Sequence, residues 1–183
     1  MATAMKRSIP ADFAGHAGEL FVAAELMRRG WTVALTARNS RAFDLLASRG
    51  DKFANIRVKT KTSASLVFRW NAKPTGDIFL DLNQRNDFCV LVDIPQNEET
   101  SPIYYVVPTP FVDKWLRDDF EAWVSTPGAK GQQRATDNKV RLFYVDEQIG
   151  KTGRGYVQKL APFKGAWRLL GEPIRFPRLP REK

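Results

Sequence analysis

The chain is poor in the side chains from which thiol and zinc sites are built. Its 183 residues include a single cysteine, Cys89, and a single histidine, His16. One cysteine excludes a disulfide within the chain, and the two residues together are too few for a Cys/His zinc site and for most Cys-His catalysis. Any chemistry must therefore come from carboxylates, lysine and arginine.

Long apolar runs are also missing. None approaches the roughly 18 to 20 residues needed to cross a bilayer, and no apolar segment of the secretory type follows residues 1–10, so we expect a cytoplasmic protein with no membrane partner. Hydrophobic residues make up 43% and charged residues 27%, which excludes a wholly disordered or coiled-coil chain. At this length we expect one domain over residues 1–170 and a basic, proline-rich tail over residues 171–183.

Acidic residues are scarce at both ends of the chain. The net charge of +9 divides into +7 over residues 1–70, −5 over residues 71–150 and +7 over residues 151–183. Two basic blocks that fold onto one face would attract phosphate with little regard to base sequence. Nucleic acid is therefore the expected partner, although a protein this basic can also carry its charge for solubility alone.

The spacing of apolar residues predicts three helices. Residues 12–29 repeat apolar positions at three and four and stop at Gly30, as in an amphipathic helix. A second helix is expected over residues 109–123, with Thr109 at its cap and with Trp115 in the core. A third is expected over residues 156–170, with Pro162 near its start or interrupting it.

Shorter apolar and alternating runs predict the strands of a sheet. They cover residues 31–35, 42–47, 54–58, 66–70, 78–82, 88–94, 103–107 and 140–145. Three successive strands early in the chain argue against a doubly wound order and favour a mixed sheet covered by helices. The polar residues 126–139 are too many for an ordinary tight connection, which predicts a functional or mobile loop.

Three places hold polar groups that a simple core would not require. Glu19 lies on the first helix, and Asp44 interrupts an apolar run just before two leucines. Alternation over residues 55–61 places a basic row on one strand face, formed by Arg57, Lys59 and Lys61. A simpler interpretation stays open for each: a first-turn carboxylate for Glu19, a turn residue for Asp44 and a solvated strand face for the lysines.

In this order the segments resemble the PD-(D/E)XK nucleases, a superfamily with the restriction-endonuclease-like fold. The residues that carry the resemblance are Gly18-Glu19, Ala23-Ala24-Glu25-Leu26, Arg29-Gly30-Trp31, Asp44-Leu45-Leu46 and Ile56-Arg57-Val58-Lys59-Thr60. The similarity covers residues 15–61 and is nearest to the Holliday-junction-resolvase-like and small endonuclease branches. It implies an α/β domain with a mixed central sheet flanked by helices.

The resemblance also implies a set of roles. Asp44 would ligate Mg²⁺ or Mn²⁺ together with the backbone carbonyl of Val58, Glu19 would support the metal or its waters, and Lys59 would position the nucleophile or stabilise the transition state. The implied activity is hydrolysis of phosphodiester bonds in DNA without a covalent intermediate. The nucleic-acid contacts that we expect are basic: Arg38, Arg41, Arg57, Lys61, Lys151 and Arg154.

Arg57 departs from the family pattern, which has Glu, Asp or Gln at this position. A guanidinium offers only donors and a fixed positive charge, so it cannot ligate a metal. Three outcomes stay open. Arg57 turns to phosphate while Glu19 and Asp44 hold a weaker metal, Asp77 or Asp81 supplies the missing carboxylate, or the site has lost its metal and only binds nucleic acid.

We therefore expect a metal-dependent deoxyribonuclease, with two alternatives. A catalytically degenerate nuclease-fold protein would bind nucleic acid without cutting it. A toxin or immunity-type module would use its basic blocks to meet an acidic protein. The sequence leaves open DNA versus RNA, the specificity, and whether the protein forms a homodimer.

Overall fold

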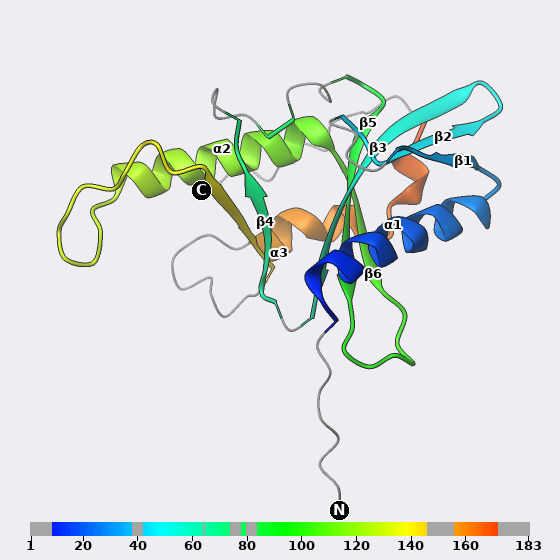
Figure 1. Cartoon of the computed structure of the whole chain (residues 1–183). Helices are drawn as coiled ribbons and strands as arrows, with labels where there is room; N and C mark the ends of the chain where they lie inside the picture. The colour runs from blue at the N-terminus through cyan, green and yellow to red at the C-terminus, as the bar shows by residue number, and fades with distance from the viewer. Residues whose placement is uncertain are drawn as a thin grey trace, which may run out of the picture.

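The chain folds into a central sheet with helices on both faces (Figure 1). The computed structural model describes residues 9–37, 42–63, 65–73, 78–79, 84–145 and 156–171. The helices are α1 (Ala11–Met27), α2 (Thr109–Ser125) and α3 (Tyr156–Leu160), followed by short 3-10 turns at Ala161–Phe163 and Trp167–Leu169. The strands are β1 (Thr32–Leu35), β2 (Leu45–Arg49), β3 (Lys52–Thr62), β4 (Val67–Asn71), β5 (Asp87–Ile94), β6 (Ile103–Pro108) and β7 (Val140–Tyr144).

The central sheet mixes parallel and antiparallel pairs. Its five strands have the order β1-β2-β3-β5-β6, while β4 and β7 form a separate antiparallel pair. β1, β2 and β3 run antiparallel to one another, β3 is parallel to β5, and β5 is antiparallel to β6. A mixed sheet flanked by helices confirms the fold class expected from the sequence.

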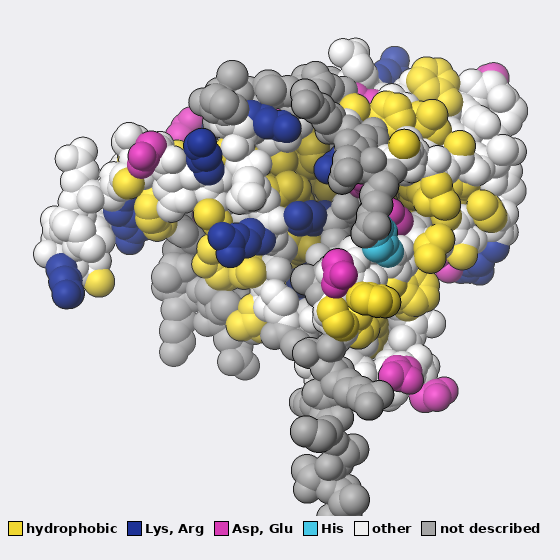
Figure 2. All heavy atoms as spheres, in the orientation of Figure 1, with side chains coloured by type: hydrophobic (Ala, Val, Ile, Leu, Met, Phe, Trp, Pro, Cys, Tyr) yellow, Lys and Arg dark blue, Asp and Glu magenta, His cyan; other side chains and the backbone are white. Residues whose placement is uncertain are grey.

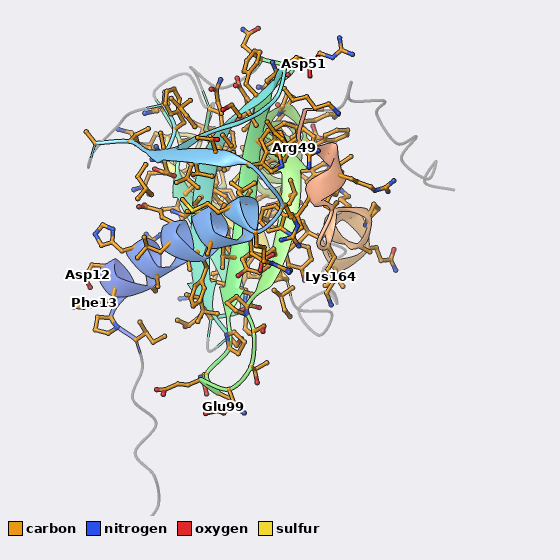
Figure 3. The ribbon with its side chains drawn as sticks, turned by 90° about the vertical axis from the view of Figure 1, so that its right-hand side faces the viewer. Asp12, Phe13, Arg49, Asp51, Glu99 and Lys164 are labelled. Atoms are coloured by element: carbon orange, nitrogen blue, oxygen red, sulfur yellow. The ribbon has the colours of Figure 1, made fainter. Side chains whose placement is uncertain are left out.

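Each face of the sheet has its own core. On one face, Val22 and Leu26 of α1 pack against Ile56 of β3 and Val90 of β5, and all four are fully buried. Figure 3 shows α1 lying across this face, with Phe13 at its N-terminal end. On the other face, α2 and the β4-β7 pair cover the sheet through a cluster that includes Phe68, Cys89, Leu91, Trp115 and Phe143.

The third predicted helix is wrong in its length. α3 ends at Leu160, and the chain continues as the 3-10 turn Ala161–Phe163. The reason is Pro162, which lacks an N–H and whose ring clashes with a continuing α-helix. The predicted cap is also wrong, because Thr109 is the first residue of α2 and Pro108 holds the cap position without a side-chain hydrogen bond.

The strand expected at residues 78–82 is not found in its described part. Ile78 and Phe79 are buried but lie outside any strand. The N–H of Ile78 donates to Asp113 Oδ1 at 2.8 Å, so a side chain of α2 takes the place of a strand neighbour. Residues 80–82, like residues 172–183 of the expected tail, lie outside the described residues.

A helix that crosses a bilayer needs about 20 predominantly apolar residues. None of the described helices combines the length and the apolar character that such a crossing needs.

Substitution of Phe143 tests the core beneath α2. The Phe143 ring lies 6.2 Å from that of Trp70 and 6.0 Å from that of Trp115, between centroids. We expect Phe143→Ala to lower the free energy of unfolding by about 3–5 kcal/mol, because it removes buried aromatic surface and leaves a cavity. Phe13→Ala is the matched control at a side chain 66% exposed, and we expect less than about 0.5 kcal/mol. Equal losses in urea unfolding would contradict this core.

Candidate functional site

The site begins where β2 and β3 part. β2 pairs with β3 from Lys52 to Ile56, and β3 continues to Thr62 with no described strand beside it on this edge. At the point of separation, the N–H of Asp44 donates to the carbonyl of Ile56 at 2.8 Å. Asp44 Oδ2 then accepts the N–H of Val58 at 2.7 Å. A carboxylate thus replaces the missing strand neighbour at the open edge of β3.

This hydrogen bond sets the direction of two groups. The N–H and C=O of one strand residue point to the same edge, so the carbonyl of Val58 faces the same open edge as Asp44. Leu45, the next residue after Asp44, is fully buried and keeps the carboxylate at the rim of the sheet. Burial raises the pKa of Asp44, while the N–H of Val58 and the charges of Arg57 and Lys59 oppose that rise.

Glu19 reaches the same edge from α1. It lies in the middle of the helix, so the interpretation as a first-turn carboxylate is wrong. Burial raises the pKa of Glu19, and the charge of Asp44 raises it further. His16 Nδ1 lies 3.7 Å from Glu19 Oε2 and lowers the pKa of Glu19. Glu19 lines the groove beside Val58, whose N–H Asp44 accepts, so the helix and the sheet edge bring the two carboxylates to one place.

Gly18 allows α1 to approach β3 this closely. A Cβ at this position would overlap the hydroxyl oxygen of Thr60. That oxygen is buried and has no hydrogen-bond partner among the described residues. The Gly18-Glu19 pair therefore has a physical basis, because the glycine sets the contact between helix and strand that brings the glutamate to the site.

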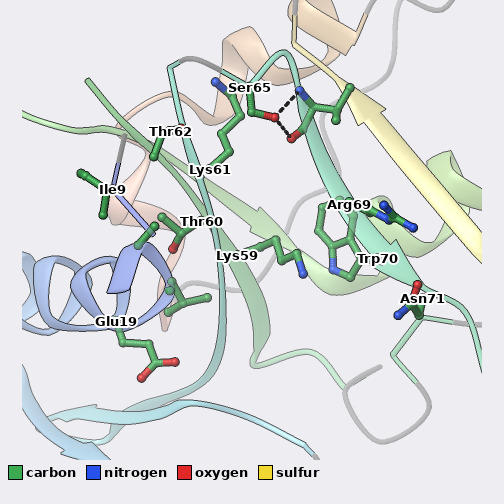
Figure 4. A pocket seen from close by; sticks show the side chains of 14 residues that line it. Ile9, Glu19, Lys59, Thr60, Lys61, Thr62, Ser65, Arg69, Trp70 and Asn71 are labelled. Carbon is green, nitrogen blue, oxygen red and sulfur yellow. Dashed lines mark hydrogen bonds between the residues drawn. The ribbon is translucent and has the colours of Figure 1, made fainter. Parts of the chain in front are cut away.

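A groove of about 570 Å³ runs along the open edge of β3. Figure 4 shows Glu19 on one side of it and Lys59 on the other, next to the ring of Trp70 from β4. Lys59 Nζ lies 5.5 Å from the centroid of that ring. Burial lowers the pKa of Lys59, and the nearby charge of Arg57 lowers it further. The amine and the carboxylate therefore share one hollow.

Arg57 also lies beside the carboxylates. Its Nη1 is 3.4 Å from Asp44 Oδ1, and its side chain is about one-third exposed, at 34%. The register with Cys89 of β5 fixes the backbone of Arg57 in the middle of the sheet. An ion pair at this distance compensates part of the charge of Asp44, so Arg57 competes with any cation for the same oxygen.

The donors at this edge fit one hard divalent cation. Asp44 and Glu19 offer carboxylate oxygens and Val58 offers a carbonyl oxygen, a set that suits Mg²⁺ or Mn²⁺ with water completing the shell. In the described ranges, no group of three or more His, Cys, Asp or Glu side chains forms a richer cluster. The observation that favours a cation is geometric: Glu19 and Val58 line one groove, and Asp44 Oδ2 accepts the N–H of Val58.

Lys61, one of the expected nucleic-acid contacts, forms an ion pair within the sheet. Its Nζ lies 2.6 Å from Asp93 Oδ2, and the residue is only 7% exposed. Asp93 stands directly opposite Lys61 in the parallel register of β3 and β5. Lys61 is therefore held in a buried ion pair at the wall of the groove, and its contact with nucleic acid stays a prediction. Four expected contacts and two alternative carboxylates lie outside the described residues: Arg38, Arg41, Lys151, Arg154, Asp77 and Asp81.

Two aromatic residues of β4 had no role in the sequence interpretation. Trp70 lies over Lys59, and Phe68 lies over Lys61, with Nζ 5.7 Å from the ring centroid in the second pair. Both strands place these side chains two residues apart, so each lysine meets one ring. The matching alternation of the two strands was the available signal, but the sequence does not say that β4 crosses this part of β3.

Gly18 provides a test of how α1 is positioned. We expect Gly18→Ala to lower the free energy of unfolding by about 1–3 kcal/mol, because the new methyl group meets Thr60. Gly15→Ala is the matched control, since nothing lies within 4 Å of its Cβ, and it should raise stability by about 0.4–1 kcal/mol. Thermal unfolding measures both. Opposite signs are expected, and stabilisation by both variants would contradict the close contact.

Comparisons with known proteins give a likeness of fold. No family model and no curated protein matches the chain. A bacterial homing endonuclease, I-Ssp6803I, matches with a TM-score of 0.48 at 15% identity, covering 88% of this chain and 93% of that chain. Hjc, a Holliday junction resolvase from Archaeoglobus fulgidus, matches with a TM-score of 0.35 at 14% identity, covering 72% and 89%. Matches of this strength assign no activity to this chain.

Proposed function

We propose that this chain is a metal-dependent endonuclease that hydrolyses phosphodiester bonds in DNA. The observation that carries the proposal is geometric: Glu19 and Lys59 line the groove at the open edge of β3, and Asp44 is hydrogen-bonded to Val58 of the same edge. The three side chains come from different elements, and packing of the core requires none of them at this place. Two acids and an amine beside a groove are what hydrolysis of a phosphodiester needs.

Each side chain has a task that its surroundings support. Asp44, held by the N–H of Val58, would bind Mg²⁺ or Mn²⁺ together with Glu19 and the carbonyl of Val58. A bound divalent ion supplies an activated water and neutralises charge on the phosphate. Lys59, whose pKa is lowered by burial, would orient the attacking water or donate to a phosphate oxygen as its charge grows. The expected hydrolysis is direct, without a covalent intermediate.

The distribution of charge supports a nucleic-acid substrate. The chain carries a net charge of +9. Figure 2 shows Lys and Arg side chains gathered around the middle and left of the face that it presents, whereas apolar side chains prevail over α1 and β1 to β3. Arg69 of β4 is exposed and lines the groove. A polyanion held by this side of the molecule would bring a phosphodiester to the edge where Glu19 and Asp44 lie.

One observation favours a second candidate function. Arg57 already pairs with Asp44, and a fixed guanidinium at this oxygen disfavours a metal. A protein of this kind would bind nucleic acid through the same groove without cutting it. Salt-dependent binding without cleavage, at any Mg²⁺ or Mn²⁺ concentration, would support the degenerate alternative. If the protein binds no nucleic acid, the nuclease and the degenerate nuclease are both excluded, and the protein-interaction module is the remaining alternative.

Cleavage assays on plasmid and branched DNA test the catalytic assignment. We expect cleavage that depends on added Mg²⁺ or Mn²⁺, and we expect Asp44→Ala and Lys59→Ala to lower its rate by about 100-fold or more. Asp51→Ala, at the tip of the β2-β3 hairpin, and the exposed Lys164→Ala are charge-matched controls (Figure 3). Wild-type rates in both site variants would refute the assignment.

Arg57→Glu tests whether this residue weakens the metal site. The change removes the competing guanidinium and adds a carboxylate, so we expect tighter Mn²⁺ binding by titration calorimetry and faster cleavage at limiting metal. Arg168→Glu makes the same change of charge at an exposed position in the turn Trp167–Leu169 and should alter neither quantity. Unchanged metal binding in Arg57→Glu would count against the placement of the metal.

A further inference from the structure

Residues 126–139, called the arm here, project from the body of the molecule. The arm leaves the C-terminal end of α2 and returns to the start of β7 (Figure 1). None of its residues is buried, so it contributes no side chain to either core. Exposed connections of this length are uncommon without a function. The fold does not explain the arm, which points to a role in binding.

Specific contacts hold the arm in one shape. Arg134 Nη1 donates to the carbonyl of Trp123 at 3.1 Å, and its guanidinium carbon lies 4.8 Å from the centroid of that ring. At the tip, the N–H of Gly128 donates to the carbonyl of Gln132 at 2.8 Å, and Gly131 has a φ of 76° that favours glycine. A connection ordered in this way presents the same side chains in the same place, as recognition requires.

The tip presents a cation and an amide to solvent. Lys130 and Gln133 are both exposed. The backbone N–H of Lys130 donates to the side-chain oxygen of Gln132 at 3.0 Å. The Lys130 side chain therefore projects from an ordered backbone. A lysine pairs well with phosphate or with the acceptors of guanine, and a glutamine pairs with the donor and acceptor of adenine. The arm therefore carries the chemistry of a duplex contact.

The arm is anchored at the candidate site. At its base, the carbonyl of Lys139 accepts the N–H of Ala72 at 2.7 Å, and Val140 pairs with Asn71, which lines the groove. The nine residue-to-residue steps from Lys139 back to Lys130 span at most about 30 Å. At roughly 3.4 Å per base pair, the tip reaches no further than about nine base pairs from the end of the groove.

We propose that the arm reads DNA sequence beside the cleaved bond, with Gln133 contacting a base edge and Lys130 contacting phosphate. The inference rests on the proposed function, because it requires duplex DNA in the groove. It adds a source of specificity that the residues at the open edge of β3 do not provide, since those residues meet the sugar-phosphate backbone. The two contacts also affect binding differently: an amide that reads a base changes the sequence preference, whereas a lysine on phosphate changes the salt dependence.

Selection from a randomised duplex pool, followed by equilibrium binding, tests the arm in the full chain. We expect the wild type to enrich a sequence within about nine base pairs of the cut. Gln133→Ala should weaken binding to that sequence about tenfold and leave random duplexes unaffected. Lys130→Ala should weaken both and reduce the slope of log affinity against log salt by about 1. Lys164→Ala is the control with the same loss of charge, and both quantities should stay at the wild-type values.

The outcomes separate the arm from the catalytic proposal. Wild-type sequence preference in Gln133→Ala, or a wild type that enriches no sequence, would overturn the reading role. A protein or a second copy of this chain bound at Lys130 in place of DNA would overturn it too. Sequence-dependent binding without cleavage would refute the endonuclease and leave the arm supported. Unchanged thermal unfolding of both variants will show that any loss comes from contacts, because both side chains are exposed.

Discussion

One hydrogen bond, from the N–H of Val58 to the carboxylate of Asp44, joins the fold to its candidate site. It forms where β2 leaves β3, so an acid satisfies an edge N–H that would otherwise need water or another strand. Leu45 is fixed in the core one residue later, which prevents the carboxylate from leaving the rim. The separation of β2 from β3 therefore leaves the edge of β3 open to the groove and places the carboxylate of Asp44 there. Gly18 completes the arrangement from the other side by admitting α1 to the same edge.

Much of the fold follows from the periodicity of apolar residues. The three-and-four spacing before Gly30 corresponds to α1, and the alternating or apolar runs correspond to the strands of the mixed sheet. The differences arise where one residue overrides its surroundings. Pro162 ends a helix that the apolar spacing would continue, and Asp113 captures the N–H of Ile78 that a strand neighbour would have taken. A pattern of apolar residues contains neither interaction.

The sequence predicts a site residue only where its chemistry differs from that of its neighbours along the chain. Glu19, Asp44 and Lys59 stand out because an acid in an apolar run and a lysine on an alternating strand have few roles in a core. Lys61 has the same strand and the same parity as Lys59 and also lines the groove, yet its Nζ pairs with Asp93. That difference depends on the register of β3 with β5, which no local pattern reveals. The rings of β4 depend likewise on a strand crossing that the sequence leaves open.

The charge of Arg57 connects the binding of the two expected ligands of the site, a divalent cation and a DNA phosphate. Two carboxylates, Asp44 and Glu19, lie near two bases, Arg57 and Lys59, so the formal charges at this edge sum to about zero. A divalent cation alone would leave an excess of positive charge in a half-buried hollow, and a phosphodiester alone would meet two carboxylates. A divalent cation would add two positive charges and a phosphodiester one negative charge, so the phosphate would compensate half of the charge that the cation brings. Under the proposed function, metal and DNA would each raise the affinity for the other. On this view an arginine at a position where the resembled family carries an acid or glutamine makes metal binding conditional on substrate.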